Sequence, residues 1–269
     1  MTTKAVILAR GLGSRMRAGS SGEGAAPRDA AVEAGVKGMI DVGRPFLDYA
    51  ISSLADAGIT KVCLVIGSEH QQIRDRYARP DVATRVRIDF AEQVRPLGTA
   101  NALLAAESFA NGDDVLVVNA DNYYPAEALR ALQKCTGAAV AVFERDALIA
   151  RSNIPSERIA AFSIVGIGSD GFLERIVEKP SPAQVRAMGT PLYMGMNSWR
   201  MSPQIFEACR RVRPSVRGEL ELLDAVDISM RELGVRYAVL TFEAGVLDLS
   251  TRGDIASVRE ALRDVTPRL

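Results

Sequence analysis

The fold is decided at the start of the chain, by the stretch AVILARGLGSRM from Ala5 to Met16. Five apolar residues form a short run, and a glycine-rich turn follows it directly. Such a run predicts a strand, and the turn places Gly11 and Gly13 at its carboxyl end. Glycines let the main chain approach phosphate oxygens with its amides pointing inward, and Arg15 adds a fork of charged donors. This segment therefore predicts a strand that leads into a phosphate-binding turn.

Two widespread phosphate-binding motifs are excluded at this turn. The third glycine position of the dinucleotide fingerprint holds Met16, and no Gly-Lys-Ser/Thr sequence follows as in a Walker P-loop. Taken alone, a bare Gly-x-Gly is equally compatible with an ordinary connection between a strand and a loop.

The first half of the chain alternates strands with helices. Apolar runs predict strands at 5–9, 62–67, 86–90 and 115–118, and helical patterns fall at 45–58, 69–78 and 99–109. Continuous apolar runs are typical of strands buried on both faces, so we expect an α/β fold with a doubly wound, mostly parallel, Rossmann-like sheet. The second half is more mixed, with expected strands at 138–143, 160–165, 172–177 and 193–199 and helices at 203–211, 219–233 and 252–263. We treat residues 1–269 as a single domain.

Composition excludes several classes of protein. Lys plus Arg equals Asp plus Glu at 33 each, which gives no global electrostatic reason to expect nucleic acid or an anionic membrane as a partner. The three cysteines, Cys63, Cys135 and Cys209, lack metal-ligand spacing and favour a reducing compartment. No signal peptide and no membrane-spanning run is visible, so we expect a cytoplasmic protein. With His70 as the single histidine, a His-dependent triad is disfavoured.

The segment that follows carries a family resemblance. It reads VKGMIDVGRPFLDY from Val36 to Tyr49. The order of a Gly-x-Gly-Ser-Arg-Met turn, a lysine and a Gly-Arg-Pro-Phe-Leu-Asp-Tyr segment resembles the sugar-phosphate nucleotidyltransferases, such as glucose-1-phosphate thymidylyltransferase and uridylyltransferase. In that family the arginine and the lysine bracket the triphosphate. The resemblance therefore implies catalytic roles for Arg15 and Lys37, and a nucleotidyltransferase form of the predicted sheet.

Three features depart from the family pattern. Arg10 stands where a small residue is usual, and Val36 stands where proline is usual. A stretch rich in Gly, Ala and Ser, from Ala18 to Ala34, also separates Arg15 from Lys37. Its small residues lie between two phosphate-binding elements, so we expect a flexible loop that closes over the triphosphate.

A base-binding constellation follows the third predicted strand and reads EQVRPLGTANAL at 92–103. Pro96 and Gly98 form a turn, after which a helix begins with free amides and a positive dipole end. The amide of Gln93 can donate and accept at once, as reading a pyrimidine edge requires. The family's Gln-x-x-Pro-x-Gly signature implies that this glutamine contacts the base, with UTP or dTTP favoured. We expect Leu12 and the turn to bound the nucleotide pocket.

Two aspartates are candidate ligands for Mg²⁺. Asp121 follows a hydrophobic strand, where its carboxylate suits a hard cation that prefers oxygen ligands, although an Asx-type turn is also common there. The resemblance implies a metal role for this aspartate and for a second one in the late segment VLDLSTRGD, which is Asp248. Asp254 is expected near the start of the following helix.

The sugar-phosphate side is assigned by resemblance. A Glu-Lys-Pro tripeptide implies that Glu178 binds sugar hydroxyls and that Lys179 binds the sugar phosphate. The segment PSVRGELEL implies that Arg217 assists that phosphate, while Glu219 is a candidate cap for the helix expected to begin there. Gly195 matches the glycine-containing strand that lines the sugar pocket. Residues 1–135 would then form a nucleotide-binding half and 136–269 a sugar-phosphate-binding half.

The function implied by the resemblance is condensation of a nucleoside triphosphate with a sugar-1-phosphate, with Mg²⁺ as cofactor and pyrophosphate as second product. A guanylyl- or cytidylyltransferase of the same fold and a non-catalytic relative that binds nucleotide sugars remain as alternatives. A glycosyltransferase is disfavoured because the segment at 121–123 is not Asp-x-Asp. The expected partners are small molecules, and a homo-oligomer is compatible with the family.

Overall fold

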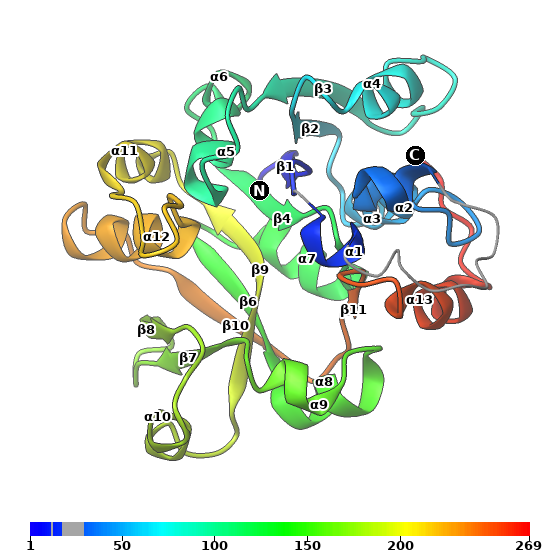
Figure 1. The fold of residues 1–269 in the computed structure, drawn as a ribbon. Helices are drawn as coiled ribbons and strands as arrows, with labels where there is room; N and C mark the ends of the chain where they lie inside the picture. Colours follow the sequence, from blue (N-terminus) through cyan, green and yellow to red (C-terminus); the bar gives the residue numbers. More distant parts are fainter. Residues whose placement is uncertain (12, 18–29) are drawn as a thin grey trace.

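The computed structural model describes residues 1–11, 13–17 and 30–269, and one large sheet organises them (Figure 1). The strands are β1 (Lys4–Leu8), β2 (Lys61–Ile66), β3 (Arg87–Glu92), β4 (Val115–Asn119), β6 (Ala139–Glu144), β7 (Ser163–Ile167), β8 (Leu173–Val177), β9 (Tyr193–Met201) and β10 (Ala238–Phe242). Their order across the described sheet is β10-β6-β9-β4-β1-β2-β3, with β7 paired to β8 and β9. A separate antiparallel ribbon joins β5 (Asn122–Tyr123) to β11 (Leu247–Asp248).

Strand direction differs between the two halves of the sheet. β1 lies parallel to β2 and β4, and β2 lies parallel to β3. β9 runs antiparallel to both β4 and β6, which introduces the mixed part. The expected α/β fold, mostly parallel in its first half and mixed in its second, is confirmed.

Helices cover both faces of this sheet. They are α1 (Ser14–Arg17), α2 (Ala30–Ala34), the 3-10 helix η1 (Lys37–Met39), α3 (Phe46–Asp56), α4 (Gln71–Tyr77), α5 (Thr99–Ala105), α6 (Glu107–Ala110), α7 (Ala126–Lys134), α8 (Arg145–Arg151), α9 (Ser156–Ile159), α10 (Pro182–Ala187), α11 (Gln204–Arg211), α12 (Leu222–Arg231) and α13 (Asp254–Leu262). Figure 1 shows α5, α11 and α12 grouped together at one side of the sheet.

The core explains why both faces are covered. Successive side chains of a strand point to opposite faces, and in β1 both Val6 and Ile7 are fully buried. Ile7 belongs to a cluster that includes Leu54 of α3 and Leu132 of α7. Val6 belongs to a different cluster, which includes Leu103 of α5 and residues of α11 and α12. A continuous apolar strand therefore requires helices on both sides.

The described helices also correct parts of the expectation. The stretch 18–34 was expected to be a loop throughout, but its last five residues form α2, in which Ala31 and Val32 are buried in a cluster with Met16. Burial of these apolar side chains stabilises a helical turn at that point. Residues 18–29, and with them the expected loop closure, lie outside the described residues.

Several element boundaries differ from the sequence pattern, and three of them have a cause in neighbouring segments. The helix expected at 99–109 is divided at Ala106 into α5 and α6. The helix expected at 219–233 begins at Leu222, so Glu219 does not cap it. The main chain of Leu220 instead donates to the Leu97 carbonyl and accepts from the Ala100 amide, at 2.7 and 2.9 Å. The strand expected at 160–165 begins three residues later, because α9 precedes it.

Among the helices of the described residues, none has the length and apolar character needed to cross a membrane.

Candidate active site

A cavity of about 410 Å³ lies at the carboxyl ends of β1 and β4. Parallel sheets characteristically bind ligands at this edge. The predicted site residues that line the cavity are Gly11, Gly13, Arg15, Lys37, Gln93, Pro96, Gly98 and Asp121. The structure thus brings the predicted phosphate, base and metal groups of the first half together. Leu12 lies outside the described residues.

The glycine turn is shaped by a close main-chain approach. Gly13 has a φ of +58°, and a Cβ at this position would lie 2.2 Å from the Gly35 carbonyl oxygen. A larger residue would therefore push the turn away from the segment that leads to Lys37. Arg15 follows on α1 and is exposed, so its guanidinium is accessible to a bound anion.

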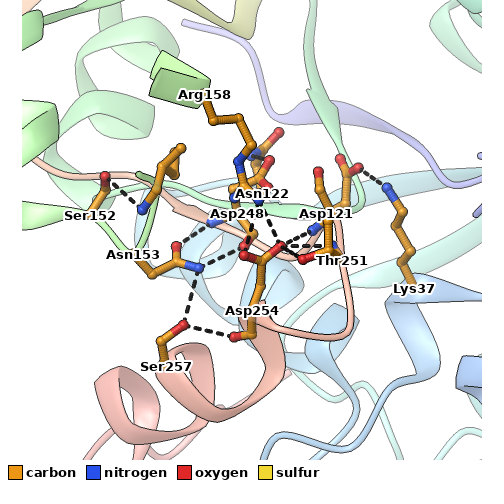
Figure 2. A network of polar contacts seen from close by, with 12 residues as sticks. Lys37, Asp121, Asn122, Ser152, Asn153, Arg158, Asp248, Thr251, Asp254 and Ser257 are labelled. Atoms are coloured by element: carbon orange, nitrogen blue, oxygen red, sulfur yellow. Dashed lines mark hydrogen bonds and ion pairs between the residues drawn. The ribbon is translucent and has the colours of Figure 1, made fainter. Parts of the chain in front are cut away.

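Lys37 and Asp121 are in direct contact, although 84 positions separate them in the chain. The Lys37 ammonium nitrogen lies 2.8 Å from Asp121 Oδ2, and both side chains are only partly exposed. Figure 2 shows Lys37 pointing toward Asp121 at the edge of the polar network. Lys37 begins η1, and Asp121 follows β4, so two separate elements hold this pair.

Asp248 lies on β11, which pairs with β5, and Asp121 directly precedes β5. In the β5–β11 ribbon Asp248 pairs with Asn122, and the Leu249 amide donates to the Asp121 carbonyl at 2.8 Å. Burial, followed by the negative charge of Asp121, raises the pKa of Asp248 above its usual range. The negative charge of Asp121 thus acts on Asp248, although Asp121 lines the 410 Å³ cavity and Asp248 does not.

Arg158 was not predicted from the sequence. Its Nη2 lies 2.9 Å from Asp248 Oδ1, and its Nη1 lies 3.1 Å from both carboxylate oxygens of Asp254 (Figure 2). Asn153 supports the same strand, because its amide exchanges hydrogen bonds with the main chain of Asp248 at 2.8 and 2.9 Å. Neither residue belongs to a recognisable motif, so the sequence offered no signal for them.

The carboxylates fit Mg²⁺ as part of a larger ligand set. Asp121 and Asp248 offer hard oxygen donors whose mutual repulsion a cation would relieve. Among the residues that the structure describes, no group of three or more His, Cys, Asp or Glu side chains could enclose a metal. Mg²⁺ commonly takes one or two carboxylates and completes its shell with waters and substrate phosphates. These donors therefore suit a metal that arrives with a nucleotide.

The residue predicted to contact the base, Gln93, has a buried side-chain amide. Its Nε2 donates to the Gly98 carbonyl and to Asn101 Oδ1, both at 3.0 Å. The two amide hydrogens are thus used within the protein, while Oε1 accepts no hydrogen bond from the residues that the structure describes. This is narrower than the donor-and-acceptor role expected from the sequence. Asn101, for which the sequence predicted no role, fixes the orientation of the amide.

The sugar-side residues form a second group. Lys179 has a φ of +45° and directly follows Glu178, which comes after β8. Burial and then the charge of Glu221 raise the pKa of Glu178, while the nearby cations Arg217 and Lys179 lower it. Arg217 is held by Glu221, with Nη2 2.7 Å from Oε1. Lys179 and Arg217 thus both lie near enough to Glu178 to act on its carboxyl.

Gly195 occupies a crowded position on β9. A Cβ there would lie 2.6 Å from Ser163 Oγ on β7, so glycine allows the two strands to approach. Gly195, Glu178, Lys179 and Arg217 do not line the 410 Å³ cavity, whereas Glu219 and Ser250 do. The nucleotide-side and sugar-side predictions therefore occupy different parts of the described structure.

Comparison with known proteins identifies the class. Residues 4–265 match the family model described as Nucleotidyl transferase, and the chain belongs to that family. A UTP–glucose-1-phosphate uridylyltransferase of Haloferax volcanii is 26% identical over 264 residues, which cover 98% of this chain and 98% of that protein. A glucose-1-phosphate thymidylyltransferase of Streptomyces antibioticus is 27% identical and covers 99% of this chain, which spans 68% of that protein.

The fold is shared with solved structures as well. A UDP-glucose pyrophosphorylase complexed with UDP-glucose superposes with a TM-score of 0.74 at 18% identity, covering 99% of this chain and 100% of that one. The resemblance to sugar-phosphate nucleotidyltransferases that the motifs predicted is confirmed, and so is the expected enzyme class.

Proposed function

We propose that this protein joins UTP or dTTP to a sugar-1-phosphate, forming a nucleotide sugar and releasing pyrophosphate. The observation that carries the proposal is the convergence of Arg15, Lys37 and Asp121 on a single cavity beside the glycine turn. A triphosphate and a sugar phosphate repel each other in water, so an enzyme that joins them must supply cations at fixed positions.

The reaction needs positioning rather than a protein nucleophile. A phosphate oxygen of the sugar-1-phosphate attacks the α-phosphorus in line, a new P–O bond forms, and the bond to the β-phosphate oxygen breaks. Pyrophosphate leaves with that bonding pair. Arg15 and Lys37 neutralise the triphosphate during this exchange. Asp121 and Asp248 would hold Mg²⁺, which supplies further charge stabilisation when bound.

The two halves of the chain would divide the substrates. Residues 1–135 bind the nucleotide through the glycine turn, Gln93 and the turn at Pro96 and Gly98. Residues 136–269 bind the sugar phosphate, with Lys179 and Arg217 on its phosphate and Glu178 on sugar hydroxyls. Support comes from the effect of Lys179 and Arg217 on the carboxyl of Glu178 and from the names of the relatives, which include glucose-1-phosphate.

The direct test is a pyrophosphate-release screen. Each common nucleoside triphosphate is paired with a panel of sugar-1-phosphates in the presence of Mg²⁺, and the nucleotide sugar is identified by mass spectrometry. We expect release that depends on both substrates, with UTP or dTTP leading. Lys37→Ala should lower turnover by orders of magnitude, whereas Lys134→Ala, an exposed lysine at the end of α7, should not. Release that does not depend on a sugar phosphate, or no release with any pair, would refute the proposal.

A further inference from the structure

Arg10 is the feature of the cavity that the proposed function leaves unexplained. It follows the end of β1, lines the cavity together with Gln93, and has a side chain that is only 9% exposed. By the resemblance noted above, a small residue is usual at this point of the motif, so the guanidinium is an additional group in this part of the cavity. A cation buried to this degree is stabilised only by well-oriented partners.

Those partners hold Arg10 in one orientation. Its Nε lies 2.9 Å from Glu69 Oε1 and its Nη2 lies 3.2 Å from Glu69 Oε2, which makes a two-point ion pair. Its Nη1 donates to the main-chain carbonyl of Gln93. Three of the five guanidinium N–H groups are thus engaged, and two have no partner among the described residues.

Gly67 leaves room for this ion pair. A Cβ on Gly67 would lie 2.3 Å from Arg10 Nε and 2.2 Å from Glu69 Oε2. Burial opposes ionisation of Glu69, but the hydrogen bonds and charge of Arg10 outweigh it and hold the pKa of this carboxyl below its usual value. The pair is therefore ionised, and it connects the ends of β1, β2 and β3 around the base side of the cavity.

Arg10 and Gln93 line the same cavity and offer it groups of opposite hydrogen-bonding character. The amide hydrogens of Gln93 are used by Gly98 and Asn101, so its free group is the acceptor Oε1. The free groups of Arg10 are N–H donors. Uracil and thymine carry a ring N–H next to a carbonyl, which matches this pair, whereas cytosine carries an unprotonated ring nitrogen next to an amino group. Cytosine would place donor against donor and acceptor against acceptor.

We propose that Arg10 is a specificity-determining residue whose guanidinium donates to the base carbonyl beside the ring N–H accepted by Gln93, and so selects uracil or thymine over cytosine. This inference rests on one part of the proposed function, namely that the cavity binds the base of a nucleotide. Guanine has the same arrangement of a ring N–H next to a carbonyl. The pair therefore excludes bases with an amino group next to an unprotonated ring nitrogen, and discrimination against the larger guanine falls to other parts of the pocket.

The experiment measures binding separately from catalysis. Binding of UTP and CTP is measured by calorimetry without a sugar phosphate for the parent protein and for Arg10→Ala, Arg10→Lys and Glu69→Gln. Arg74→Ala is the matched control, because Arg74 forms an ion pair with Glu92 at the end of β3 but does not line the cavity. Steady-state kcat and KM are then measured for both triphosphates.

We expect the parent to bind UTP at least tenfold more tightly than CTP. Arg10→Ala should reduce that ratio at least tenfold, mainly through UTP, and should raise KM for UTP more than it lowers kcat. Arg10→Lys and Glu69→Gln, which retain a cation with looser orientation, should give intermediate ratios, and Arg74→Ala should keep the parent ratio. An equal loss of affinity for both triphosphates would overturn the inference, since it would make Arg10 a phosphate or structural contact.

A parent protein that prefers CTP would also overturn it. If no sugar phosphate supports turnover, the proposed function fails, but the ratio of binding constants still decides the role of Arg10.

Discussion

Replacing Arg158 by methionine should destabilise the folded protein by about 3 kcal/mol, the low end of the range for breaking a buried ion pair. The guanidinium makes three contacts of 2.9–3.1 Å with two carboxylates. The carboxylate side chains are 9% exposed in Asp248 and 7% exposed in Asp254, so removal of the cation leaves two buried negative charges. Methionine fills a similar volume without a charge.

The estimate lies at the low end because each carboxylate keeps other partners. Asp254 still accepts from the amides of Ser250 and Thr251, and Asp248 still accepts from Asn122. Arg158 is itself 21% exposed, so solvent screens part of its charge. For a chain of this size, about 3 kcal/mol corresponds to a fall of roughly 6–12 °C in Tm.

The assay is urea unfolding followed by circular dichroism in EDTA, so that metal binding does not contribute. Arg145→Met is the control, because Arg145 forms an exposed pair with Asp146 and should change stability by less than about 0.5 kcal/mol. The double variant Arg158→Met/Asp248→Asn should recover part of the loss, since it removes one stranded charge. A loss below about 1 kcal/mol for Arg158→Met, or one equal to that of the control, would refute the reasoning.

Three further predictions concern single side chains. Asp121→Asn should lower turnover by orders of magnitude at saturating Mg²⁺, because metal charge stabilisation is worth several kcal/mol; near-normal turnover would remove Asp121 from the metal site. Lys179→Ala should raise KM for the sugar phosphate about 10- to 100-fold and leave KM for the triphosphate nearly unchanged, as a lost charge-assisted hydrogen bond requires; an equal effect on both would place Lys179 elsewhere. Burial lowers the pKa of His70 below its ordinary value of 6.5, so the stability contributed by the neutral ring is complete above that pH and is lost as the pH falls through the folded-state value. NMR titration of this single histidine checks the direction, and a value above 6.5 contradicts it.

Much of the fold could be predicted because a strand that is buried on both faces requires a continuous run of apolar residues, which is visible in the local sequence. The strand at 115–118 is continuously apolar, since both of its faces are covered, and the structure has β4 at that point. Predictions of element boundaries were wrong where contacts with residues distant in the sequence determine the boundary. The start of α12 is set by Leu220, whose main chain pairs with the turn at Leu97, and no periodicity in the helix itself could indicate this.

The site residues also divide into those that the local sequence predicts and those that depend on contacts between distant parts of the chain. The convergence of Gln93 and Asp121 on one cavity could be predicted, because each lies just beyond a predicted strand and strand ends of a parallel sheet meet at one edge. Arg158 and Glu69 could not be found, because each matters only through a partner brought near by loops. Arg158 lies 90 positions from Asp248, and Glu69 lies 59 positions from Arg10. Such pairs depend on the spatial order of the elements, which the local sequence does not contain.

Main-chain contacts join the turn predicted to lie beside the base to the segment that follows Arg217. Gly98 has a φ of +113°, and a Cβ there would lie 2.5 Å from the Leu220 carbonyl oxygen. The Leu222 amide also donates to Thr99 Oγ1 at 2.8 Å, so the turn beside the base and the segment after Arg217 are held by direct hydrogen bonds. This close approach therefore requires a glycine at position 98. Under the proposed function, the turn beside the base and the segment that follows Arg217 cannot move independently of each other without breaking these hydrogen bonds.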